Sequence, residues 1–122
     1  MSTTFSTSKA KSLLDKFDAA ISQKESKGKI DTWEKSEDGK YYTHKAKEWN
    51  KKAWFKPALK TEGLVFNIIK PQGSDITTIV YAYYHGHLIE TFLNHFDSDF
   101  TVGSATALPT AGDLCSSEQK SA

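Results

Sequence analysis

The sequence predicts an α+β fold, a two-layer sandwich with an N-terminal helix, a five-stranded antiparallel meander and a C-terminal helix packed on the sheet. Apolar residues recur at helical spacing over residues 8–23 and again over residues 87–97. Between them, residues 29–84 are rich in aromatic and β-branched residues and are interrupted by turn signals. Because an amphipathic helix must bury its apolar stripe, both helices are expected to lie on one face of the sheet.

The two expected helices each carry one apolar stripe. In residues 8–23 the stripe consists of Ala10, Leu13, Leu14, Phe17, Ala20 and Ile21. In residues 87–97 it consists of Leu88, Ile89, Phe92, Leu93 and Phe96. The first helix is expected to end in the lysine-rich segment that contains Gly28.

Five strands are expected between the helices, at about residues 29–35, 40–46, 53–59, 63–70 and 75–84. Asp38-Gly39 is a strong hairpin signal between the first two strands. In the fourth strand, Leu64, Phe66 and Ile68 alternate onto one side and are the expected core face. A sixth strand within residues 100–108 remains an open alternative.

A single domain is expected over residues 1–110, followed by a disordered tail over residues 111–122. The segment after Pro109 is rich in small and polar residues, which favour disorder. The only cysteine, Cys115, lies in this tail and cannot form an internal disulfide. Since no stretch resembles a signal peptide or a membrane span, the sequence predicts a reducing, cytoplasmic location.

Charge is distributed unevenly along the chain. Residues 24–60 contain eleven lysines and six acidic residues, whereas residues 61–122 contain two lysines and seven acidic residues. The chain has no arginine, the residue that binds guanine edges and phosphates through a bidentate fork, so nucleic acid is not an expected partner. A basic surface would attract an acidic protein or the acidic part of a second copy. Alternatively, the lysines only keep the surface and the sheet edges soluble.

An aromatic and lysine-rich surface of the sheet is the predicted binding site. The face of the sheet without helices would expose it, and two interpretations stay open: an open binding or dimer surface, or a face covered by the tail and by lysine stems. The residues expected to bind are Trp33, Tyr41, Trp49, Trp54, Lys45, Lys47, Tyr81 and Tyr83.

Three of the four histidines lie within residues 81–96 and form the alternative candidate site. In a helix over residues 87–97, His87 and His95 are about 12 Å apart along the axis and cannot share one metal ion. His85 at a strand end, with His87 and Glu90 in the first helical turn, could form a small acid–base or ligand pocket. These three are the candidate catalytic residues. The alternative is a solvent-facing junction without function.

Other chemical motifs are missing from the sequence. It contains no glycine-rich phosphate loop, no CxxC pair and no nucleophile elbow, so neither a cofactor nor a metal site is predicted. His44 is expected to be a packed or sheet-edge residue. The sequence therefore favours a small non-catalytic module that binds a protein partner or a second copy of itself. An enzyme or small-molecule pocket at His85, His87 and Glu90 is the alternative.

Overall fold

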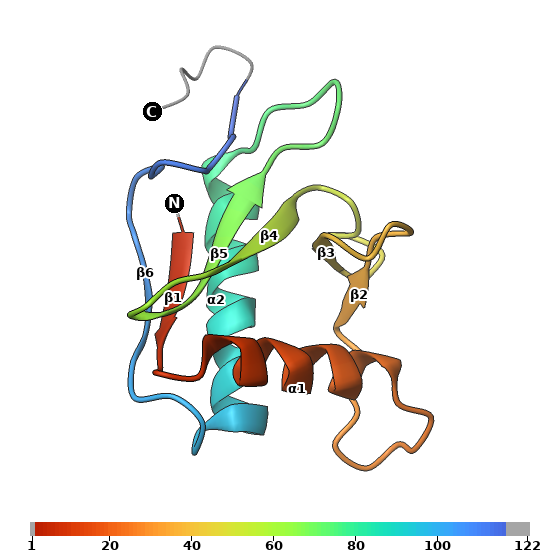
Figure 1. Cartoon of the computed structure of the whole chain (residues 1–122). Coiled ribbons are helices and arrows are strands. Elements are labelled where there is room, and N and C mark those ends of the chain that lie inside the picture. The colour runs from red at the N-terminus through yellow and green to blue at the C-terminus, as the bar shows by residue number, and fades with distance from the viewer. Residues whose placement is uncertain (1, 117–122) are drawn as a thin grey trace.

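The computed structural model describes residues 2–116, and within them it contains two helices and six strands (Figure 1). The elements are β1 (Ser2–Ser6), α1 (Ala10–Ser22), β2 (Trp33–Lys35), β3 (Tyr42–His44), β4 (Trp54–Leu59), β5 (Gly63–Ile69), α2 (Thr78–Phe96) and β6 (Gly103–Ala105). The predicted α+β class with an antiparallel sheet is confirmed.

All six strands form one sheet in the order β2-β3-β4-β5-β1-β6. Strands β2 to β5 form four of the five strands of the expected meander, and β6 confirms the sixth strand that the sequence left open. The N-terminal strand β1 was not predicted. It lies between β5 and β6, where Thr4 pairs with Val65 on one side and with Ser104 on the other. Because β1 consists of serine and threonine apart from Phe5, it lacks the alternating apolar pattern that predicts a strand. Phe5 is nevertheless completely buried.

Both helices pack on the same face of the sheet, as the sequence predicts. Phe66 of β5 points to this face, and its ring lies 5.8 Å from the Phe17 ring of α1 and 5.7 Å from the Phe92 ring of α2. Phe17 and Phe92 also contact each other at 5.0 Å, and Phe5 stacks on Phe92 at 4.0 Å. These four rings form the centre of the core, with α2 running behind the sheet in Figure 1.

The prediction of a fifth strand over residues 75–84 is wrong, because this segment contains the start of α2. The helix begins at Thr78, and the Thr77 hydroxyl caps it by accepting a backbone N–H at 3.3 Å. Residues 79–84 would be apolar on both sides of a strand, and such a run is also compatible with a helix. Here the helix is favoured because Tyr84 continues the buried stripe of Leu88, so that one 19-residue helix covers the sheet.

The C-terminal segment pairs with β5 beyond the N-terminal end of β1. Leu114 forms a parallel bridge with Ile69, and its N–H donates to the Ile68 carbonyl at 2.8 Å. The first part of the segment that the sequence assigned to a tail, residues 111–116, is thus attached to β5. The rest of that segment, residues 117–122, lies outside the described residues.

Asp113 attaches this segment to β5 by accepting hydrogen bonds at both of its carboxylate oxygens. The Ile68 backbone N–H (3.0 Å) and the Asn67 side-chain amide (2.9 Å) donate to Oδ1, and the Thr110 backbone N–H (2.7 Å) donates to Oδ2. In Asp113→Asn, an NH2 group would face one of these donors. We therefore expect this substitution to lower the free energy of unfolding by about 1–3 kcal/mol in urea denaturation at pH 8. Equal unfolding midpoints for Asp113→Asn and the exposed control Asp31→Asn would contradict this.

Candidate functional site

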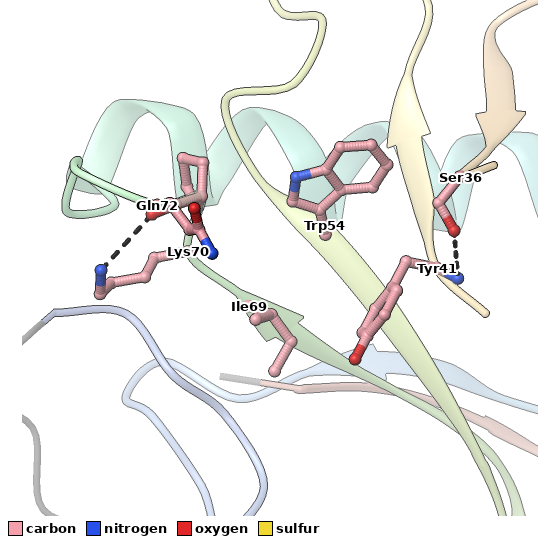
Figure 2. Close-up of a pocket in the computed structure, with 7 residues that line it drawn as sticks. Ser36, Tyr41, Trp54, Ile69, Lys70 and Gln72 are labelled. Atoms are coloured by element: carbon pink, nitrogen blue, oxygen red, sulfur yellow. Dashed lines mark hydrogen bonds between the residues drawn. The ribbon is translucent and has the colours of Figure 1, made fainter. Parts of the chain in front are cut away.

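The face of the sheet opposite the helices contains a hollow. Phe55 and Ile68 pair across β4 and β5 and are fully buried in the core. Their neighbours Trp54 and Ile69, which also pair, therefore point to the opposite face. The hollow around them has a volume of about 340 Å³. Its lining residues are Ser36, Tyr41, Trp54, Ile69, Lys70, Pro71 and Gln72 (Figure 2).

The hollow is apolar at its centre and basic at its rim. Figure 2 shows the rings of Trp54 and Tyr41 beside the side chain of Ile69, with Lys70 further along the wall. Lys56 follows Trp54 by two residues, lies on the same face of β4 and is exposed. Neither Lys56 nor Lys70 forms an ion pair with a described residue. The Lys70 ammonium donates one hydrogen bond, to the Pro71 carbonyl at 3.4 Å (Figure 2), and its charge, like that of Lys56, is not neutralised by a described acidic residue.

The β2–β3 turn positions Tyr41 at the wall of the hollow. The Tyr41 N–H donates to the Ser36 hydroxyl (3.1 Å), and the Ser36 N–H donates to the Tyr41 carbonyl (2.8 Å). Gly39 has a φ of 74°, which glycine adopts without strain, as expected for the predicted Asp38-Gly39 hairpin. The turn signal in the sequence thus accounts for the position of one wall of the hollow.

Only part of this sheet face is covered. The C-terminal segment lies against Asn67, whose side-chain amide donates to Asp113 at 2.9 Å and whose side chain approaches Gly112. No helix lies over Trp54 and Tyr41, and both side chains are partly exposed. The face is therefore covered in one part and open in another, and binding at the open part stays a prediction.

The predicted binding residues are divided among several places. Tyr41 and Trp54 line the hollow. The other six lie elsewhere. Trp33 and Tyr81 are buried in the core, Trp49 and Tyr83 stack on each other beside α2, and Lys45 and Lys47 are on an exposed loop.

The structure does not bring His85, His87 and Glu90 into one site. All three lie within α2 rather than at a strand–helix junction. His85 points into the core with 3% of its surface exposed, and its Nδ1 shares a hydrogen bond with the Thr3 hydroxyl. Burial lowers the pKa of His85 to about 3. Glu90 is exposed, and no cluster of three metal-ligating side chains occurs between residues 2 and 116.

A different histidine pair, His44 and His87, joins β3 to α2. His44 is 2% exposed, in agreement with its predicted packed position. Its Nδ1 accepts the Ala46 N–H (3.1 Å), so its proton lies on Nε2 and is donated to His87 Nδ1 at 3.3 Å. A metal ion on His44 Nε2 would need that proton on Nδ1, where it would meet the Ala46 N–H. The geometry thus favours a hydrogen-bonded pair over metal ligation.

His87 also ends a stack of rings on the side of α2. The Tyr83 ring lies 4.0 Å from His87 at 22° and 3.7 Å from Trp49 at 10°, and Lys52 Nζ lies 5.6 Å from the centre of the Trp49 ring. Trp49 and Tyr83 therefore bury their faces against each other and fasten the loop over residues 45–52 to the helix. No local pattern in the sequence predicts this stack, because its rings come from segments about 35 residues apart.

Comparison with known proteins gave no match to a protein-family model, to a curated protein or to a solved structure. Neither helix in residues 2–116 is both long enough and apolar enough to cross a lipid bilayer.

Proposed function

We propose that the protein is a non-catalytic binding module whose outer hollow receives an apolar side chain from an acidic protein segment. The hollow at Trp54 carries this proposal, because it is an aromatic cavity on the sheet face that neither helix covers. Its volume, about 340 Å³, is at the lower end of the range for ligand sites. Such a cavity suits one or two side chains better than a large cofactor. The single cysteine supports a reducing, cytoplasmic location for this activity.

The surroundings of the hollow support an extended partner segment. A second hollow of about 440 Å³ shares Ser36 and Trp54 with the first and has a mixed-charge lining of Lys35, Lys51, Glu34 and Glu37. A peptide could therefore lie on both sides of the Trp54 indole. Tryptophan and tyrosine are the residues that most often dominate the energy of protein interfaces. Lys56 and Lys70 would pair with acidic residues that flank the inserted side chain.

Replacement of Trp54 by alanine should abolish most of this binding. A displayed library of random 12-residue peptides would first be selected against the wild-type protein. We expect the selected peptides to combine one aromatic or large aliphatic residue with several acidic residues. For such a peptide, Trp54→Ala should raise the Kd about 30-fold, equivalent to the loss of about 2 kcal/mol. Titration calorimetry with the synthetic peptide measures this change.

Two controls separate the hollow from general surface effects. Leu59→Ala removes another exposed side chain from β4, outside the hollow, and should leave the Kd within a factor of about two. Lys56→Gln and Lys70→Gln should each weaken binding more at low than at high salt, whereas Lys11→Gln on α1 should not. Selected peptides that are neutral or basic, or that bind Trp54→Ala as tightly as wild type, would refute the proposal.

A further inference from the structure

The outer side of helix α2 carries a stripe of exposed apolar residues beside polar residues such as Asn94. Ile79 and Leu93 are 72% and 52% exposed. Ala82 and Gly86 lie between them and are also exposed, and Glu90 is at the edge of this stripe. A surface helix in a monomeric domain normally carries polar residues on its outer face, and adjacent exposed apolar residues there often mark an interaction site. The outer stripe therefore calls for a partner.

The outer stripe is self-complementary about Gly86. Ile79 precedes Gly86 by seven residues, and Leu93 follows it by seven. At about 100° per residue, these three positions lie within roughly 40° of one another around the helix axis. If a second copy of α2 crosses antiparallel at Gly86, Ile79 packs on the partner's Leu93, and the reverse contact follows by symmetry. This is the pattern of a two-fold interface, in which both copies use the same patch.

Gly86 itself supports a close approach by another chain. Glycine within a helix costs about 0.5–1 kcal/mol relative to alanine, so its presence needs a reason. Its φ is not in the left-handed region, and an added Cβ would meet no atom within 4 Å outside the adjacent helix backbone. Neither backbone conformation nor packing within residues 2–116 therefore requires glycine at this position. A second helix that crosses here does, because small residues let two helix backbones approach closely.

We propose that the protein forms a two-fold dimer in which the α2 helices of two copies cross antiparallel at Gly86. The antiparallel arrangement sets the two helix dipoles head to tail. One 19-residue helix from each copy makes a contact below the standard interface size, so a micromolar Kd is expected. The hollow at Trp54 faces away from α2 across the sheet and remains open in this dimer. Peptide binding and dimerisation can therefore be tested separately.

Sedimentation equilibrium of the full chain tests the proposal. The protein concentration should run from about 1 µM to about 1 mM, so that it spans the Kd of a weak dimer. Wild type should fit a monomer–dimer equilibrium. Gly86→Lys should raise the dimer Kd at least tenfold while its thermal midpoint stays equal or rises, because a better helix former replaces glycine. The control Asn94→Lys adds the same charge to an exposed position of α2 outside the stripe and should change the Kd less than threefold. A wild type that is monomeric at 1 mM, or a dimer insensitive to Gly86→Lys, would overturn the proposal.

Disulfide formation tests the orientation of the helices in a Cys115→Ser background. An equimolar mixture of Ile79→Cys and Leu93→Cys chains should form a cross-linked heterodimer on mild oxidation. Each variant alone should remain largely uncross-linked, because in an antiparallel crossing two identical positions are about 20 Å apart along the axis. Preferential cross-linking of Ile79→Cys with itself would indicate a parallel crossing and refute the proposed arrangement.

Discussion

Lowering the pH from 6.5 to 4.5 is expected to reduce the free energy of unfolding by about 2–3 kcal/mol. Two histidines are buried in the neutral form. Burial, together with the neighbouring His87, lowers the pKa of His44 to about 4, and burial lowers the pKa of His85 to about 3. In the unfolded chain both should titrate near 6.5. Below that pH the unfolded state binds two more protons than the folded state, so stability falls with pH until the folded-state pKa values are reached.

Asp113 opposes this loss over part of the same range. Burial raises the pKa of its carboxyl to about 6, above the value of about 3.8 in the unfolded chain. Between these two values the folded state binds the extra proton, so Asp113 makes folding more favourable as the pH falls from 6 to 4. The net difference is one proton, which corresponds to about 1.4 kcal/mol per pH unit near pH 5.

Urea denaturation at half-unit steps from pH 7 to pH 4 would measure this slope. Asp113→Asn removes the opposing group, so its slope near pH 5 should approach two protons, or about 2.7 kcal/mol per pH unit. The control Asn94→Gln changes an exposed residue that does not titrate and should retain the wild-type slope. A free energy of unfolding that is flat between pH 6.5 and 4.5 would show that His44 and His85 accept protons in the folded state.

Phe92→Ala is expected to lower the free energy of unfolding by about 3–5 kcal/mol. The Phe92 ring is fully buried and contacts Phe5 of β1, Phe17 of α1 and Phe66 of β5, so one truncation leaves a cavity between four elements. Because domains of this size are stable by about 5–15 kcal/mol, the variant should lose a large part of its stability.

Equilibrium urea unfolding of Phe92→Ala, followed by fluorescence and by circular dichroism, measures this loss. Val102→Ala truncates an apolar side chain that is 55% exposed and should change the free energy of unfolding by less than about 0.5 kcal/mol. Phe92→Leu keeps much of the volume and should lie between the two. Unfolding midpoints that coincide for Phe92→Ala and Val102→Ala would contradict the central role of this ring.

The parts of the fold that bury one clear face could be predicted from the sequence. The α1 stripe was predicted because Leu13 and Phe17 stand out from lysines and aspartates on the other side. The inner face of β5 could be predicted because Leu64, Phe66 and Ile68 alternate strictly along the sequence. All three side chains are fully buried. The prediction for the segment before residue 87 was wrong for the opposite reason. Both sides of this segment are apolar, so its pattern fits the period of a strand as well as that of a helix.

The candidate site could be predicted only in part. Trp54 and Tyr41 were recognised as aromatic residues in a lysine-rich region, and the hairpin turn that positions Tyr41 was visible in the sequence. The hollow itself also depends on the end of β5, which approaches Trp54 only when β4 and β5 pair. The His44–His87 hydrogen bond joins residues 43 positions apart, and no local spacing predicts such a contact.

The position of β1 determines the order in which the molecule can fold as it is synthesised. This strand is translated before both of its neighbours, residues 63–67 and residues 103–105. Until they are synthesised, Phe5 stays unburied and both edges of β1 stay unpaired. Completion of the sheet therefore depends on contacts between residues far apart in the sequence, and such non-local pairing slows folding.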